Sequence, residues 1–193
     1  MQIANIILND VQNGESGIVV SLWVSGCPHK CPGCHNTELW DYSYGQDIPI
    51  DQLKIIIQKM ISAEGITRDL AILGGEPLDP SKRDEMAELL KHIKFVYPDK
   101  KIYLWTGYDY KDVKELECLK YVDVLIDGKF DITKRDLTLK LRGSSNQNIY
   151  YRKGRRLKKG GNKWHHILNG KRLIKRIMKR LEKLLLLLQM NMN

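Results

Sequence analysis

Short apolar runs alternate along the chain with segments in which apolar residues recur at helical spacing. The runs are rich in β-branched and aromatic residues, which is typical of buried strands. They predict strands at residues 17–24, 69–73, 101–105 and 121–126, with an edge strand or lead-in at 3–8. The helical spacing predicts helices at residues 51–61 and 110–118, and one that opens at Asp79-Pro80 with Asp79 as its N-cap.

Alternation of strand and helix argues for a parallel sheet with right-handed crossovers. The units are too few to close an eight-stranded barrel, so the predicted fold is α/β, a partial (β/α) barrel. Ligands of parallel α/β sheets bind at the carboxyl ends of the strands. We therefore expect a functional site in the loops that follow residues 24, 73, 105 and 126.

Basic residues are concentrated at the end of the chain. From Tyr151 onward there are 14 Lys or Arg and one Glu, whereas the first 150 residues hold 18 Lys or Arg and 22 Asp or Glu. The net charge of +9 therefore belongs to the last segment, and the body gives no reason to expect nucleic-acid binding. We expect one domain at residues 1–150 and a basic amphipathic helical tail at 151–193.

The predicted tail has apolar residues on one helical face of 171–188 and Lys or Arg on the opposite face. Such a helix could lie on an anionic membrane, dock onto an acidic surface of a partner, or touch nucleic acid. A poorly ordered appendage is the simpler interpretation.

Three of the four cysteines lie in one short loop, as Cys27, Cys31 and Cys34, and glycine and proline keep this loop out of helix and strand. A [4Fe-4S] cluster normally takes four thiolates, so three would leave one iron open to another ligand. The alternative is a zinc-binding interaction module with His35 as fourth ligand, although His35 directly follows Cys34, which makes joint tetrahedral ligation awkward. The distant Cys118 is expected to be a small buried hydrophobe.

Cysteine usage of this kind indicates a reducing compartment, because clustered thiols plus one distant cysteine do not form a disulfide framework. The chain opens with neither a charged region nor a long apolar run, and no window reaches the length of a membrane span. We therefore expect a cytoplasmic protein.

The cysteine loop and several later segments together resemble the glycyl-radical activases of the radical S-adenosylmethionine superfamily, in particular the activators of anaerobic ribonucleoside-triphosphate reductase. The spacing C-x3-C-x2-C carries the resemblance to the superfamily. The narrower match adds Leu-Gly-Gly-Glu-Pro-Leu at 73–78, Leu-Trp-Thr-Gly-Tyr at 104–108, Val-Leu-Ile-Asp-Gly-Lys-Phe at 124–130 and Arg-Gly-Ser-Ser-Asn-Gln at 142–147. One departure is the segment 13–20, which lacks the Gly-Pro-Gly-x-Arg-like turn usual in activases.

The resemblance implies a [4Fe-4S] cluster on Cys27, Cys31 and Cys34, with S-adenosylmethionine chelated on the open iron. One electron then cleaves the sulfonium, and the 5′-deoxyadenosyl radical abstracts hydrogen from a glycine of anaerobic ribonucleoside-triphosphate reductase. A low-potential electron donor such as flavodoxin or ferredoxin is implied. The alternative within this class is a short radical enzyme that acts on pyruvate formate-lyase or on a small molecule.

The resemblance also implies cofactor contacts outside the cluster ligands. It puts the position after the third cysteine beside the adenine, which makes Gly33, Cys34 and His35 candidate cofactor contacts. It puts Gly74, Gly75 and Glu76 at the methionyl amino group. Glycines after a strand let the backbone approach a ligand, and a carboxylate can accept hydrogen bonds from an ammonium. The polar segment 144–147 is a candidate contact for the cofactor or the partner.

Overall fold

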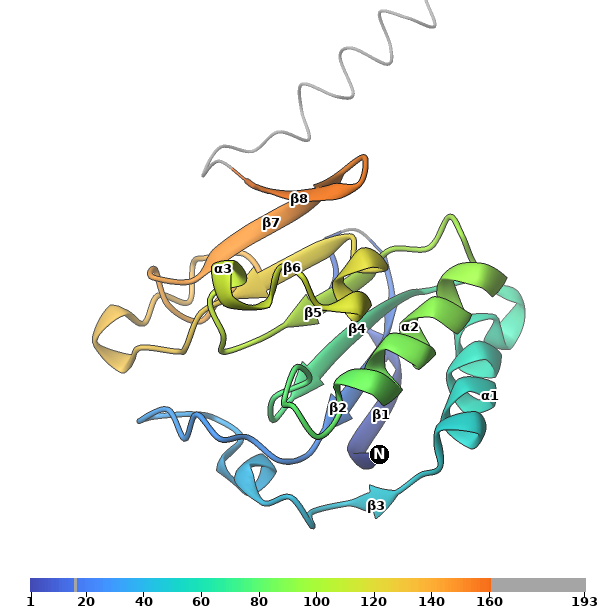
Figure 1. Cartoon of the computed structure of the whole chain (residues 1–193), viewed down its shortest axis with the longest axis horizontal. Helices are drawn as coiled ribbons and strands as arrows, with labels where there is room; N and C mark the ends of the chain where they lie inside the picture. Colours follow the sequence, from blue (N-terminus) through green and yellow to red (C-terminus); the bar gives the residue numbers. More distant parts are fainter. Residues whose placement is uncertain (16, 161–193) are drawn as a thin grey trace, which may run out of the picture. The chain divides into compact units, whose positions relative to one another are not determined.

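The central feature of the molecule is a mixed sheet of eight strands in the order β3-β1-β2-β4-β5-β6-β7-β8. The computed structural model describes residues 1–15 and 17–160 (Figure 1). The first and last strands in this order, β3 and β8, do not pair with each other, so the described sheet is open and does not close into a barrel. The chain is α/β, as predicted.

The four middle strands run parallel and are almost completely buried. They are β2 (Val19–Val24), β4 (Asp69–Gly74), β5 (Ile102–Trp105) and β6 (Val124–Asp127). All four lie where the apolar runs predict strands. Their register sets Val24 opposite Gly74 and Trp105 opposite Ile126, so their carboxyl ends meet at one edge of the sheet.

Antiparallel strands extend the sheet on both sides. They are β1 (Gln2–Asp10), β3 (Gln46–Asp47), β7 (Asn148–Lys153) and β8 (Arg156–Lys159). The expected domain boundary after residue 150 therefore falls inside β7, and the compact unit continues to Gly160. The rest of the predicted tail, with its expected helix at 171–188 and its expected contact with an acidic surface, lies outside the described residues.

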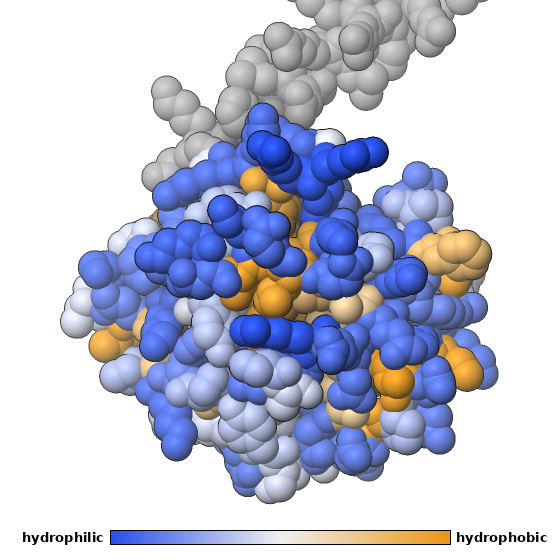
Figure 2. Space-filling view, in the orientation of Figure 1, coloured by the Kyte–Doolittle hydropathy of each residue, from blue (hydrophilic) through white to orange (hydrophobic). Residues whose placement is uncertain are grey.

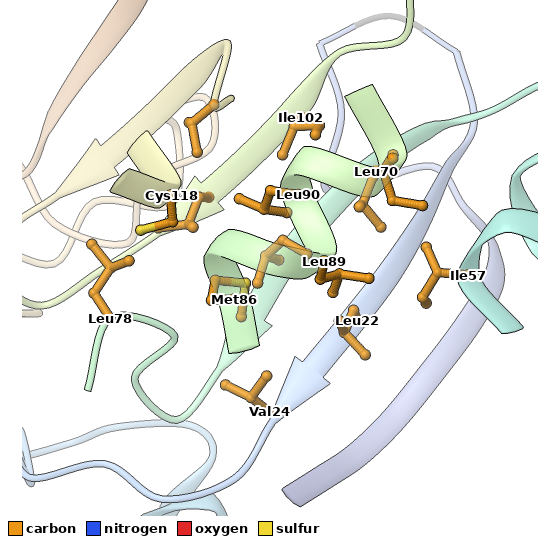
Figure 3. Packing of buried hydrophobic residues seen from close by; sticks show 14 of the residues in the cluster. Leu22, Val24, Ile57, Leu70, Leu78, Met86, Leu89, Leu90, Ile102 and Cys118 are labelled. Carbon is orange, nitrogen blue, oxygen red and sulfur yellow. The ribbon is translucent and has the colours of Figure 1, made fainter. Parts of the chain in front are cut away.

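The two long helices pack on one face of the sheet (Figure 1). They are α1 (Ile50–Ile61) and α2 (Arg83–Val96). Their buried stripes confirm the helical spacing and meet side chains of β2 and β4 in the larger apolar cluster (Figure 3). The fully buried helical residues are Leu53, Ile57, Ile61, Met86, Leu89, Leu90 and Ile93.

Two helix predictions differ from the structure. The predicted helix at 110–118 divides into α3 (Tyr110–Val113) and the 3₁₀ turn η3 (Glu117–Lys120). The helix expected at Asp79 begins later, at Arg83, because the carboxylate of Asp79 accepts hydrogen bonds from Ser81 N (3.0 Å) and Ser81 Oγ (2.6 Å) in a local turn. Asp79 is thus not the N-cap. Three further 3₁₀ turns are η1 (Thr37–Trp40), η2 (Ala63–Gly65) and η4 (Ile132–Lys134).

The opposite face of the sheet carries a smaller apolar cluster, built on Leu73, Tyr103 and Ile126, with Trp105 packed against it. The loop 136–143 lies against this cluster, since Trp105 Nε1 donates to the carbonyl of Leu141 at 2.7 Å. In Figure 2, strongly hydrophilic side chains cover the end of the sheet formed by β7 and β8. No helix within the described part of the chain is long and apolar enough to span a membrane.

Candidate functional site

The cysteine loop begins where β2 ends, at the edge of the sheet at which the other parallel strands also end. Backbone hydrogen bonds join it to the neighbouring strand end: Gly75 N donates to Val24 O at 2.7 Å and Glu76 N donates to Gly26 O at 2.9 Å. At the ends of β5 and β6, Thr106 N donates to Ile126 O at 2.9 Å. The motifs that follow β2, β4, β5 and β6 therefore converge, as predicted from the parallel topology.

All four cysteines lie within the described residues and are free thiols. Cys27 is buried, and Cys31 and Cys34 are half-buried. Burial raises the pKa of Cys27 and of Cys31, and the charge of Cys31 interacts with those of the other two thiols in the loop. Within the described residues, no three Cys, His, Asp or Glu side chains are grouped to hold a single metal ion.

Cys118 lies apart from the loop, in η3 and in the apolar cluster beneath the helices. It is 1% exposed, and burial raises its pKa to about 11. The prediction that Cys118 is a small buried hydrophobe is confirmed.

Gly74 and Gly75 allow the end of β4 to pack closely against the segment that enters the cysteine loop. A Cβ at Gly74 would lie 2.3 Å from Val24 O, and one at Gly75 would lie 2.6 Å from Gly26 O. Real Cβ atoms do not approach backbone oxygens so closely. Backbone packing therefore requires both glycines, and a contact of their backbone with a ligand stays a prediction.

The carboxylate of Glu76 is fully buried and accepts four hydrogen bonds from the chain itself. Its Oε1 accepts from Leu78 N at 2.8 Å and Thr106 Oγ1 at 2.7 Å. Its Oε2 accepts from Gly107 N at 2.7 Å and pairs with His29 Nε2 at 2.8 Å. Glu76 thus ties together the loops after β2, β4 and β5, and an ammonium at this carboxylate would share an oxygen with one of these donors.

His29, inside the cysteine loop, is a site residue that sequence reasoning missed. Its side chain is 7% exposed and meets the ring of Tyr108 edge-on, with ring centroids 4.6 Å apart. A Cβ at Gly107 would lie 2.2 Å from the imidazole, so only glycine leaves room for His29 there. Nothing local in the sequence reveals this contact, because Glu76 lies 47 positions further along.

The segment that follows β6 lies against the other side of the cysteine loop. The backbone of Phe130 forms a hydrogen bond with the Cys31 thiol, and the Phe130 and His35 rings are 6.2 Å apart. A Cβ at Gly33 would lie 2.9 Å from Ile132. Beside this region lies an open cavity of about 540 Å³. It is lined by Pro28, His29, Gly107, Tyr108, Asp109, Asp112, Gly128, Lys129 and Asn146.

Comparison with known proteins identifies the family. Residues 12–150 match a family described as a 4Fe-4S single cluster domain. The anaerobic ribonucleoside-triphosphate reductase-activating protein of Enterobacteria phage T4 is 42% identical over 142 residues, which cover 73% of this chain and 88% of that protein. The chain belongs to the family of anaerobic ribonucleoside-triphosphate reductase-activating proteins.

Bacterial members of the activating-protein family are similar over the same span. The protein of that name from Pasteurella multocida is 39% identical over 147 residues, 73% of this chain and 91% of that protein. The one from Escherichia coli K12 is 34% identical over 144 residues, 74% of this chain and 93% of that protein. Membership confirms the resemblance read from the motifs, the enzyme class and the 4Fe-4S cofactor, and the use of S-adenosylmethionine follows from the family.

The residues at the end of β2 fit the cofactor of the activating-protein family. Besides three thiols in one loop, two buried polar atoms, Ser25 Oγ and Trp23 Nε1, have no hydrogen-bond partner among the described residues. Buried donors of this kind normally have a partner, protein or ligand. Both residues directly precede the loop, so a polar group held there could satisfy them.

The polar segment 144–147 has a structural role in the described site. Gln147 Oε1 accepts from Gly143 N at 2.9 Å, and Gln147 Nε2 donates to Gly128 O at 3.0 Å. Ser144 Oγ accepts from Asp131 N at 3.2 Å. Two of these bonds join the polar segment to the segment that follows β6, while a direct contact with cofactor or partner stays a prediction.

Proposed function

We propose that this chain activates an anaerobic ribonucleoside-triphosphate reductase, the activity for which its relatives are named. The observation that supports this most directly is the placement of three cysteine thiols in one loop, at the shared carboxyl edge of four parallel strands. In this proposal Cys27, Cys31 and Cys34 bind the cluster and leave one iron open.

A bound cluster would supply one electron for the cleavage of S-adenosylmethionine into methionine and a 5′-deoxyadenosyl radical, which would take hydrogen from a glycine of the reductase and leave 5′-deoxyadenosine and a glycyl radical. Gly33, Cys34 and His35 would contact S-adenosylmethionine, with His35 beside the adenine. The backbone of Gly74 and Gly75 and the carboxylate of Glu76 would border the methionyl amino group. The buried network around Glu76 supports this role, because it fixes that strand end next to the loop before any ligand binds.

The remaining parts of the proposal follow from the same chemistry. The open sheet, with its parallel strands leading to the site, would be a partial barrel of the radical S-adenosylmethionine type. Cleavage of a sulfonium requires a cluster potential at the low end of the range for such clusters, so the electron donor would be a low-potential one such as flavodoxin or ferredoxin. A cluster of this kind would require the reducing conditions of the cytoplasm.

The test is anaerobic reconstitution with iron and sulfide, followed by dithionite and S-adenosylmethionine. The expected result is a brown protein that produces 5′-deoxyadenosine and, with the reductase added, a glycyl radical seen by electron paramagnetic resonance. Replacing Cys27, Cys31 or Cys34 by Ser should abolish cluster binding, whereas Cys118→Ser should keep it. A colourless protein with stoichiometric zinc, or a reduced cluster that yields no nucleoside, would contradict the proposal.

A further inference from the structure

Lys82, at the N-cap of α2, is a buried lysine beside the cysteine loop that none of the sequence motifs includes. The residue is only 4% exposed. Its Nζ donates to the carbonyl of Gly26 at 3.2 Å and lies 4.9 Å from the centre of the Tyr42 ring. Because that carbonyl belongs to the peptide bond between Gly26 and Cys27, the ammonium lies one residue away from a thiol of the loop.

Several contacts hold this ammonium in place. The ring of Tyr42 packs on Gly26 so closely that a Cβ there would lie 2.4 Å from the ring. Tyr42 Oη donates to Asp79 Oδ2 at 2.8 Å, which fixes the ring beneath the ammonium. The face of an aromatic ring attracts a cation and tolerates its burial. The Lys82 side chain is therefore held between the Tyr42 ring and the carbonyl of Gly26, at the start of the cysteine loop.

The charges around Lys82 are those of two buried carboxylates and of the Cys27 thiolate. Burial lowers the pKa of Lys82, and the charges of Asp79, Glu76 and Cys27 oppose that shift by favouring the ammonium. Asp79 and Glu76 are 6% and 0% exposed, so solvent screens these interactions little. Lys82 is therefore the cation of a buried group whose other charges are negative.

We propose that Lys82 is a positioning residue that sets the reduction potential of the cluster. This inference rests on the proposed function, in which Cys27 is a cluster ligand. Reduction adds one electron, and hence one negative charge, to the cluster beside the ammonium of Lys82. A fixed buried cation stabilises the more negative state, so it raises the potential and makes reduction easier for the donor.

The experiment compares the reconstituted full-length protein with Lys82→Met, Lys82→Gln and Lys82→Arg in anaerobic redox titrations followed by electron paramagnetic resonance. Met removes the charge and the hydrogen bond, Gln removes the charge but keeps a donor, and Arg keeps both. The expected result is a shift to more negative potential in Met and Gln, and a value near the unmodified protein in Arg. Lys91→Met, on the exposed side of α2, is the matched control and should cause no shift.

The possible outcomes separate the inference from the proposed function. An unmodified protein that assembles no cluster would overturn the proposed function and the inference with it. A cluster whose potential is the same in all variants would overturn the inference alone. If Gln behaves as the unmodified protein and only Met differs, Lys82 acts through its hydrogen bond to Gly26 and the charge effect is refuted. If Met fails to fold, the comparison of Gln with Arg decides.

Discussion

A single carboxylate, that of Glu76, joins three loops of the site. Its two oxygens accept from backbone N–H groups of Leu78 and Gly107, from the hydroxyl of Thr106 and from the ring of His29. In a buried network each member depends on the others, because a donor left without an acceptor loses the hydrogen bonds it made with water. Glu76 thus contributes to stability whatever it contributes to cofactor binding.

Glu76→Gln should destabilise the protein even without a cluster. The amide would turn an N–H₂ group toward donors that now face a carboxylate oxygen, and each buried donor left unpaired costs about 1–3 kcal/mol. Urea unfolding of the unloaded protein measures this. Glu115→Gln, at a side chain that is 90% exposed, is the control and should change the unfolding free energy by less than about 0.5 kcal/mol. Equal midpoints for the two variants would contradict the network interpretation.

His29→Ala should reduce the amount of iron bound after reconstitution. The substitution removes the link between the cysteine loop and Glu76 Oε2 and leaves a gap beside Tyr108. His29→Gln can still donate to the carboxylate, so it should retain more iron than His29→Ala. Iron and sulfide assays on both variants provide the measurement, and identical loading in the two would show that the link does not organise the loop.

The carboxylate of Asp79 should make the stability of the protein sensitive to acid. Burial raises its pKa, but hydrogen bonds from Ser81 and Tyr42, together with the charge of Lys82, outweigh burial and hold the pKa below its usual value. Because the pKa is lower in the folded state, the ionised carboxylate stabilises the fold. This contribution is complete above the unfolded-state pKa of about 3.9, and it is lost as the pH falls through the folded-state pKa.

Asp79→Asn therefore tests this linkage. The variant should be less stable than the unmodified protein at pH 7, and the gap should close as the pH is lowered below about 4. Denaturant unfolding at several pH values measures the gap. A difference that stays constant across the acid range would mean that the carboxylate charge is not the cause.

At the scale of elements, the strands and the long helices follow from local patterns. The stripes of α1 and α2 repeat at helical spacing, and the buried parallel strands are short apolar runs, so both could be predicted. The start of α2 could not be predicted. Asp79-Pro80 is typical of a helix start, but the Asp79 carboxylate accepts hydrogen bonds from Ser81 and Tyr42 instead of capping the helix. The hairpin β7–β8 was missed because its basic composition resembles a tail, and Leu157 is the one residue in its two strands that is buried.

Gly74→Ala tests the close packing of β4 against β2. Gly74 has a φ of +113°, and its Cβ would meet the backbone of Val24, which cannot rotate away. Gly65 is a matched control, with a φ of +73° and nothing within 4 Å of its Cβ position. Gly65→Ala should lower the free energy of unfolding by about 1 kcal/mol, because of the left-handed backbone alone. Gly74→Ala should lower it by about 1–3 kcal/mol more, because the added Cβ overpacks the strand ends.

Thermal and urea unfolding of the two alanine variants provide the comparison. Gly74→Ala should also lower iron loading, since Gly75 N and Glu76 N bind the residues that lead into the cysteine loop. Similar losses of stability in both variants would mean that the two strand ends can separate without cost.

For the molecule as a whole, local sequence located the site but not the contacts that hold it together. The cysteine spacing and the glycine-rich turn after β4 were recognisable because each lies within a few residues. The bonds from Glu76 to His29 and Thr106, and from Lys82 to Gly26, join residues 30 to 56 positions apart. Such pairs depend on the sheet topology, so a single sequence offers no direct sign of them.

The extent of the folded unit can be tested by truncation. A protein ending at Gly160 should keep the unfolding midpoint of the full chain, because the compact unit includes β7 and β8. A protein ending at Tyr150 should melt at a lower temperature, since it loses β8, half of β7 and the hydrogen bonds from Arg152 to Val122 O and Leu119 O. Equal melting temperatures of the two truncated proteins would place the domain boundary after residue 150, where the composition predicts it.

The link from His29 to Glu76 also bears on how the protein is made. On the ribosome, the segment with the three thiols emerges before the glutamate that anchors it, 47 positions later, and before β5, which completes the enclosure. Contacts of such separation form late in folding. Delivery of iron and sulfide should therefore follow synthesis rather than accompany it, and a stalled nascent chain would present three unprotected thiols to any oxidant nearby.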